Sequence, residues 1–226
     1  MQTAHKDYYQ RGIELPRDVA HERYARVTAV IKQVPTIARS YVDEAMGTEY
    51  LDDLMEERAN TSNIIHSLMC QAVKMKAEGV VHHGADAEFI TNACNNCLHI
   101  LWDVLDINEV IKVEETIFDD DWCVAGTVDL YCRAKIQDPC FLIDYKLSKY
   151  DRPDYSIQVN GAYRKMLGGE GAAKPLIFRI NPDDATVSVR EIQTSFSYDC
   201  KEFERRLGTW NYLHTRTSRF KEYKGG

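Results

Sequence analysis

The sequence contains no long hydrophobic run. None of its apolar stretches approaches the roughly 18 residues that form a membrane-spanning helix. The first fifteen residues, MQTAHKDYYQRGIEL, also lack the apolar centre of a secretory signal peptide. We therefore predict an intracellular, cytoplasmic protein without a membrane partner.

A regular framework of cysteine pairs is absent as well. The chain has seven cysteines, an odd number, scattered through its 226 residues. Small secreted domains are held by closely placed pairs, so we expect free thiols in a reducing compartment. The net charge of −7 argues against a protein that coats nucleic acid nonspecifically. An acidic enzyme can still hold metal ions and line one groove with basic residues.

Internal repeats, low-complexity tracts and interdomain linkers are missing too. There is no G-x-x-x-x-G-K-[ST] phosphate loop, so a helicase motor is not expected. The length suits one domain. We predict a single domain over 1–226, with a helical N-terminal lobe (1–60), a catalytic core (61–197) and a C-terminal helix and tail (198–226).

The first half of the sequence has helical periodicity. Apolar residues recur near the helical period over 17–58, and the polar cluster at 60–63 is suited to capping a following helix that ends near Gly79. Residues 86–106 predict a longer amphipathic helix.

The second half is rich in β-branched and aromatic residues. It predicts three strands (VIKVEETIF, WCVAGTVDLYCRA and CFLIDYKLS), a helix, two more strands (KPLIFRI and ATVSVREI) and a closing helix. The segment at 136–139 is the expected hairpin turn between the second and third strands. This order predicts an α/β fold with a mixed β-sheet flanked by helices.

The stretch FLIDYKLS, residues 141–148, carries charges inside an apolar strand. Asp144 and Lys146 are two residues apart, so their side chains point to the same face. Burying two charges costs several kcal/mol unless they are paired or bind an ion. The pair therefore suggests an ion-binding site.

A second carboxylate is expected beside this pair. A hairpin symmetric about position 137 places Asp129 across from Asp144, about 5 Å apart. Two such carboxylates repel unless a cation lies between them. Hard oxygen ligands favour Mg²⁺ or Mn²⁺ over zinc. Lys146 would then orient or deprotonate a water, or stabilise charge on a phosphate.

These residues, taken in order, resemble a known family. Gly126-Thr127-Val128-Asp129, then Ile143-Asp144-Tyr145-Lys146, then a helix that opens with Gln158, are similar to the PD-(D/E)XK nuclease superfamily, and within it to the RecB-like exonuclease branch of phage and bacterial type. The resemblance spans about 61–165 and implies a restriction-endonuclease-like sheet. It also implies an upstream histidine, matched by Ser62-Asn63-Ile64-Ile65-His66 with serine in place of glycine.

The resemblance assigns roles to several residues. It implies His66, Asp129 and Asp144 as metal ligands, with the carbonyl of Tyr145 as a further ligand, and Lys146 as the catalytic lysine. It implies Glu114 as an auxiliary ligand, with Glu115 as the second candidate. Because Glu114 and Glu115 point to opposite faces of a strand, one of them is expected to be solvated.

The helix motif departs from the family pattern. The family has Q-x-x-x-Y, whereas here Ala162 is four residues after Gln158 and Tyr163 is five after it. On an α-helix, position i+5 is rotated by roughly 100° beyond i+4. We take Gln158, Tyr155 and Tyr163 as DNA-binding candidates and expect Tyr163 to be turned off the face that Gln158 occupies.

Other residues allow more than one interpretation. Lys149 and Arg152, in the loop after the catalytic strand, suit contacts to DNA backbone phosphate or a solvated loop equally well. Cys94 and Cys97, with His82 and His83 nearby, allow a zinc site, but both cysteines fall on the apolar stripe of their helix, where buried free cysteine is ordinary. Some RecB-like relatives carry an iron–sulfur cluster with three cysteines near the C-terminus. Only Cys200 lies there, so no iron–sulfur cluster is expected.

Taken together, these features predict a Mg²⁺-dependent (or Mn²⁺-dependent) DNA exonuclease in recombination, repair or phage DNA processing, working in a bacterial cell or a phage-infected host. Its partners would be DNA and either further copies of itself or a single-strand-annealing protein of recombination. Two alternatives stay open: a site-specific endonuclease, and a catalytically inactive nucleic-acid-binding protein with the same fold.

Overall fold

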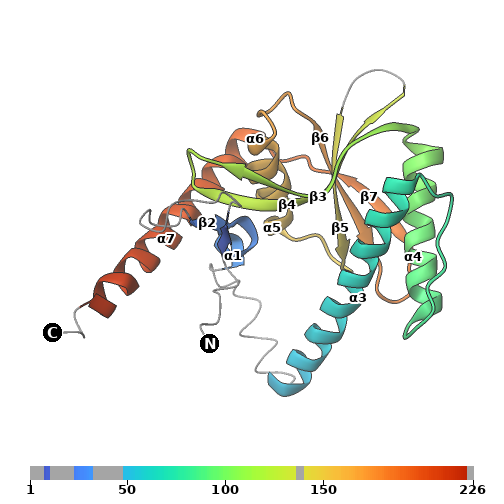
Figure 1. The fold of residues 1–226 in the computed structure, drawn as a ribbon, viewed down its shortest axis with the longest axis horizontal. Coiled ribbons are helices and arrows are strands. Elements are labelled where there is room, and N and C mark those ends of the chain that lie inside the picture. The colour runs from blue at the N-terminus through green and yellow to red at the C-terminus, as the bar shows by residue number, and fades with distance from the viewer. Residues whose placement is uncertain (1–7, 11–22, 33–47, 136–139, 223–226) are drawn as a thin grey trace.

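The computed structural model in Figure 1 describes residues 8–10, 23–32, 48–135 and 140–222. The helices are α1 (Val27–Lys32), α3 (Thr48–Met75), α4 (Ala87–His99), α5 (Pro153–Ser156), α6 (Arg164–Met166) and α7 (Phe196–Glu222), with π-helical segments η1 (Ile100–Val104) and η2 (Ile157–Tyr163). The strands are β1 (Tyr8–Gln10), β2 (Arg23–Arg26), β3 (Ile107–Asp119), β4 (Val124–Ala134), β5 (Cys140–Leu147), β6 (Lys174–Ile180) and β7 (Val187–Glu191). Within these residues, no helix combines the length and apolar character needed to cross a bilayer.

The strands of the described residues form one mixed sheet. Their order is β1-β2-β4-β5-β6-β7, and β3 also pairs with β4. The pairs β2–β4 and β5–β6 are parallel, and the remaining pairs are antiparallel. The predicted α/β class, a mixed sheet flanked by helices, is therefore confirmed.

Strand β4 has three neighbours, and their arrangement leaves a gap. β3 follows one edge of β4 along its whole length. On the other edge, β2 pairs with Val124 and Ala125, and β5 pairs with Leu130–Arg133. Residues 126–129 lie between these two ladders. No strand of the described chain covers that stretch of edge, so side chains from helices can approach it.

Apolar side chains pack on both faces of the sheet. On one face, α3 and α4 cover a core that includes Ile65, Leu98 and Phe178 (Figure 1). On the other face, α1, η2 and α7 enclose a second core around Val159 and Phe203. Because both faces are buried, the central strands β5 and β6 have nearly continuous hydrophobic sequences.

The predicted helical N-terminal lobe is wrong in part. Residues 23–26, expected inside a helix, form strand β2, because their backbone pairs with the start of β4 about a hundred residues later. The polar cluster at 60–63 does not begin a helix. It lies inside α3, which is continuous from Thr48 to Met75. Residues 8–10 of the predicted lobe form strand β1. Its parts at 1–7, 11–22 and 33–47, and the predicted turn at 136–139, lie outside the described residues.

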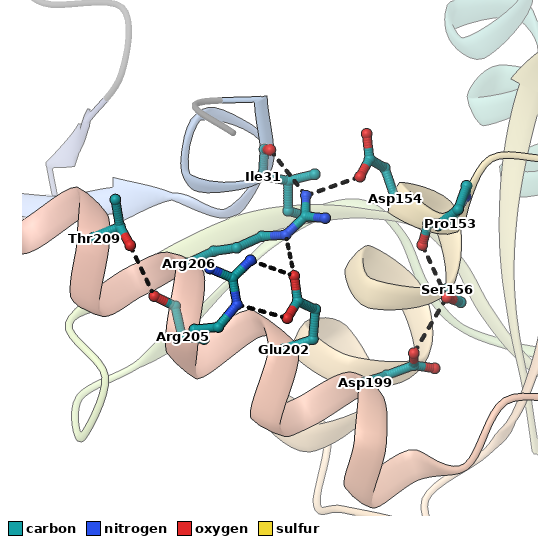
Figure 2. A network of polar contacts seen from close by, with 9 residues as sticks. All are labelled: Ile31, Pro153, Asp154, Ser156, Asp199, Glu202, Arg205, Arg206 and Thr209. Carbon is teal, nitrogen blue, oxygen red and sulfur yellow. Dashed lines mark hydrogen bonds and ion pairs between the residues drawn. The ribbon is translucent and has the colours of Figure 1, made fainter. Parts of the chain in front are cut away.

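Helix α7 is joined to α1 and α5 by an ionic network, shown in Figure 2. The buried guanidinium of Arg206 donates to the carbonyl of Ile31 at the end of α1 (3.1 Å), to Asp154 in α5 (2.8 Å) and to Glu202 one turn earlier in α7 (3.0 Å). Glu202 also accepts two hydrogen bonds from Arg205. The network fixes the position of α5, which leads directly into η2.

Candidate metal and phosphate site

The two charged residues of β5 lie on one face of the strand, as predicted. Asp144 is 2% exposed, and its Oδ2 lies 2.5 Å from the ammonium nitrogen of Lys146. Burial by itself lowers the pKa of Lys146, but the carboxylates of Asp144 and Asp129 outweigh burial and raise it above its ordinary value. Lys146 is therefore an ammonium ion at neutral pH.

Asp129 lies beside this pair, where the hairpin symmetry placed it. The ladder between β4 and β5 has Leu130 opposite Ile143, so Asp129 and Asp144 come one step further along their strands. At that step the Asp129 carboxylate, 8% exposed, accepts a hydrogen bond of 2.8 Å from the backbone N–H of Tyr145. Burial and the nearby Asp144 raise the pKa of Asp129 to about 7.

His66 reaches the same place from α3. Its Nδ1 lies 3.0 Å from Glu114 Oε1 and 3.5 Å from Asp129 Oδ2, and its Nε2 lies 3.3 Å from the carbonyl oxygen of Tyr145. Burial by itself lowers the pKa of His66, but Asp129 and Glu114 outweigh it and raise the pKa to about 9. Both ring nitrogens then donate, and the imidazolium balances the acids around it.

The structure distinguishes the two glutamates of β3. Glu114 faces the site and contacts His66, whereas Glu115 is half exposed and forms an ion pair with Lys112. Glu114 has a backbone φ of 47°, in the left-handed region that side chains other than glycine seldom adopt. Such a backbone is maintained only where the surrounding structure enforces it.

The donor set suits a divalent cation. Ligand atoms of His66, Glu114 and Asp129 all lie within 4.8 Å of one another, and the Tyr145 carbonyl adjoins them through His66. Carboxylate and carbonyl oxygens are the ligands that Mg²⁺ and Mn²⁺ prefer, and an imidazole nitrogen shifts the preference toward Mn²⁺. Asp144 contributes a further carboxylate next to Asp129.

Tyr163 lies in the site, contrary to the expectation that it would be turned away. The expectation assumed an α-helix, but residues 157–163 form the π-helical segment η2, whose hydrogen bonds join residues five apart. The amide of Gln158 accordingly lies 3.2 Å from the Tyr163 hydroxyl and 3.5 Å from Asp144 Oδ1. The extra residue in the motif is accommodated by the helix type.

Gly126 provides the space for Tyr163. A Cβ atom at position 126 would lie 2.3 Å from a ring carbon of Tyr163, a distance that no real contact adopts. The glycine of the G-x-x-D motif is therefore required because the tyrosine ring packs directly on the backbone of β4. It lies in the stretch of edge between the β2 and β5 ladders.

The other DNA-binding candidates lie nearby but outside this contact network. The Tyr155 ring lies under the Lys146 ammonium, 5.4 Å from nitrogen to ring centroid. Lys149 forms an ion pair of 2.5 Å with Asp183, and Arg152 is exposed at the start of α5. Of these three residues, only Tyr155 contacts a residue of the site.

The site residues line a cavity of about 260 Å³. Its walls include His66, Asp129, Asp144, Lys146, Gln158 and Tyr163. Arg26 of β2 and Thr28 of α1 also line it, and sequence reasoning missed both. The only available signal was the alternation in RYAR, which is too short to separate a strand from the helix that follows it.

The cysteine pair on α4 belongs to the core. Cys94 and Cys97 are fully buried among apolar side chains. Burial raises the pKa of Cys94 to about 12 and that of Cys97 well above its ordinary value. These thiols stay protonated at neutral pH, which does not favour the zinc interpretation.

Comparisons with known proteins add little. No protein-family model and no curated protein matches the chain. Among solved structures, a crystal structure of a protein called SSO0001 is 14% identical and aligns over 85% of this chain and 79% of that chain, with a TM-score of 0.37. A likeness at this level carries no argument about function.

Proposed function

We propose that this chain is a divalent-metal-dependent deoxyribonuclease that hydrolyses phosphodiester bonds, acting as an exonuclease on DNA ends. One observation supports this above all others. A single cavity brings together Asp129, Asp144 and His66 with a largely buried lysine whose ammonium contacts Asp144, and Glu114 adjoins it through its hydrogen bond to His66. Nucleases need a positive charge beside the reacting phosphate and an oriented water at the same point.

The residues that would hold the cation are His66, Asp129, Asp144 and the Tyr145 carbonyl, with Glu114 as an auxiliary ligand. A bound Mg²⁺ or Mn²⁺ would lower the pKa of water and neutralise charge on the phosphate. Because the raised pKa values of His66 and Asp129 favour their protonated forms when no cation is bound, a cation would have to displace those protons on binding.

Lys146 would act on the reacting atoms. Its ammonium is held by Asp144 over the ring of Tyr155, so it can donate hydrogen bonds to an attacking water or a phosphate oxygen. Gln158 and Tyr163 hold the other oxygen of Asp144 through a chain of hydrogen bonds. Preorganised donors of this kind stabilise charge that develops in a transition state.

The wider role follows the same proposal. We place the protein in the cytoplasm of a bacterial cell or phage-infected host, in recombination, repair or phage DNA processing. Its partners would be DNA and either further copies of itself or a single-strand-annealing protein. No iron–sulfur cluster is needed by the chemistry proposed.

Two alternatives are separated from this proposal by cleavage pattern. A site-specific endonuclease would cut closed circular DNA into discrete products. A non-catalytic binder would cut nothing, although buried acids crowded around Lys146 have no evident use in a protein that only binds.

The test is incubation with linear and covalently closed circular DNA in Mg²⁺, Mn²⁺ or EDTA. We expect metal-dependent loss of linear DNA alone. Asp144→Asn and Lys146→Ala should each lower the rate by about 100-fold or more, while Lys174→Ala, at an exposed lysine on β6, should not. Discrete cuts in the circle would favour the endonuclease, and intact DNA under every metal would overturn the proposal.

A further inference from the structure

A second and larger hollow lies beside the site, and the proposed function does not use it. Its volume is about 660 Å³. Its walls are Val73, Lys74 and Lys76 at the end of α3, and residues 108–115 of β3. We call it the β3 groove. Because consecutive rather than alternate residues of β3 line it, the groove follows the edge of the strand and not one face.

That edge of β3 is open in the described chain. β3 pairs with β4 along its other edge, and no strand of the described residues pairs with this one. Backbone N–H groups of the open edge are therefore available as hydrogen-bond donors. Backbone donors, together with lysine, are the groups with which proteins contact phosphate oxygens without reading sequence.

The charges in the β3 groove leave an excess of lysine. Each of its three glutamates has a cationic partner: Glu109 pairs with Arg133 at 2.7 Å, Glu114 with His66, and Glu115 with Lys112. Lys74 and Lys76 have no acidic partner among the described residues, and the Lys76 ammonium donates only to the carbonyl of Asn108 (3.3 Å). Two ammonium groups are therefore uncompensated along one side of the groove.

The β3 groove and the catalytic cavity meet at one contact. Glu114 lines the groove, His66 lines the cavity, and the two side chains are hydrogen-bonded at 3.0 Å. From Asn108 to Glu114 the strand covers about 20 Å at the usual rise per residue.

From these observations we infer that the β3 groove binds the sugar–phosphate backbone of a single DNA strand and leads it past Glu114 into the catalytic cavity. This inference rests on the proposed function and adds the path of the substrate to it. Recognition is by charge and backbone donors, so it is independent of sequence. The groove has no aromatic lining on which bases could stack.

An extended peptide added to the open edge is less well supported. The register of β3 shifts between Ile107 and Glu109 and again between Val110 and Lys112, and Lys112 lies in the same stretch. Bulges and lysines on edge strands disfavour pairing with another strand. An acidic peptide is therefore included in the test as a competitor.

The experiment measures binding separately from cleavage. A fluorescent single-stranded oligothymidylate is titrated in EDTA with the natural chain, with Lys74→Glu/Lys76→Glu, and with the control Lys174→Glu/Lys201→Glu. The control has the same net charge, and its lysines are exposed on β6 and on α7, across the sheet from α3. We expect at least tenfold weaker binding for the groove variant. The slope of log affinity against log salt should also become shallower by about 1.4, because two phosphate contacts are lost.

Equal affinities and slopes for the two variants would overturn the inference, and so would competition by oligoglutamate as strong as that by unlabelled oligothymidylate. If the natural chain cleaves DNA while the groove variant binds normally, only the inference fails. If the natural chain neither binds nor cleaves DNA, in EDTA or with Mn²⁺, both the inference and the proposed function fail.

Discussion

Two ionic clusters lie in buried parts of this molecule, and they are balanced in different ways. In the α7 cluster of Arg206, Glu202 and Asp154, each charge has an opposite partner at hydrogen-bond distance (Figure 2). In the site cluster, the acids Glu114, Asp129 and Asp144 face only two cations, His66 and Lys146. Charge there is balanced only if Asp129 keeps a proton.

The pKa values express the same difference. In the α7 cluster, hydrogen bonds from Arg205 are the main cause that lowers the pKa of Glu202 to about 2. In the site cluster, burial and neighbouring acids raise the pKa of Asp129 to about 7. The α7 cluster keeps its acid ionised, whereas the raised pKa of Asp129 favours a proton in the site cluster that a bound cation would displace.

Removing the central cation of the α7 cluster should have the largest effect. Arg206→Ala leaves Glu202 and Asp154 without their shared partner and frees the end of α1, so we expect a loss of about 3 kcal/mol in the free energy of unfolding. Arg205→Ala, at the exposed neighbour, should cost much less, because solvent screens its ion pair. Urea unfolding followed by circular dichroism compares the two. Equal losses would show that the buried cluster has no special structural role.

The site cluster should respond in the opposite way to loss of an acid. Without metal, Asp129→Asn removes a crowded carboxylate yet keeps an acceptor for the Tyr145 N–H, so stability should not fall. With Mn²⁺ at about 100 times its dissociation constant, the natural chain should gain about 2.7 kcal/mol, and the variant much less. Thermal unfolding with and without Mn²⁺ measures both. An equal gain in the variant would exclude Asp129 as a ligand.

Gly126→Ala tests whether the tyrosine of η2 belongs to the site cluster. A methyl group at position 126 collides with the Tyr163 ring, and overpacking of this kind costs about 1–3 kcal/mol. Displacing the ring also removes the partner of Gln158, so cleavage should slow. In a Tyr163→Ala background, where the ring is absent, Gly126→Ala should cost little further stability. An equal cost of Gly126→Ala in both backgrounds would mean that the backbone, and not the ring, requires glycine.

The two clusters should also differ in the sign of their pH dependence. Glu202 has a lowered pKa, so its contribution is present above about pH 4.5 and is lost as the pH falls toward 2. His66 has a pKa raised from 6.5 to about 9, so its contribution in the metal-free protein is lost as the pH rises through that range. We expect a slope of about 1 kcal/mol per pH unit near pH 8.

His66→Ala should remove the alkaline loss, and Glu202→Gln the acidic loss. Urea unfolding across the pH range in EDTA measures both. An alkaline loss that persists in His66→Ala would assign it to another group.

Much of the site could be predicted because it depends on local geometry. The two-residue spacing of Asp144 and Lys146 fixes their common face in any strand. The short connection between β4 and β5 fixes the register that places Asp129 beside them. Neither inference needs knowledge of distant contacts, and the structure has both arrangements.

The predictions from sequence fail where contacts between residues far apart in the chain decide the structure. Residues 23–26 are strand because β4 offers an edge about a hundred residues later, which no local pattern reveals. The polar cluster at 60–63 resembles a helix start, yet α3 continues through it, because packing of Ile65 and Met69 into the core outweighs the local preference. Arg26 and Thr28 were missed as cavity residues for the same reason.

The π-helical segment η2 has a consequence for how such proteins are found. Gln158 and Tyr163 are five residues apart, one more than the four-residue spacing that brings side chains together on an α-helix, yet their side chains are in contact. A sequence search that requires a spacing of four residues will reject the pair. A structural comparison of side-chain positions around the helix axis will accept it. A single-residue insertion in a helix can therefore hide a motif from alignment while the contact between its side chains is kept.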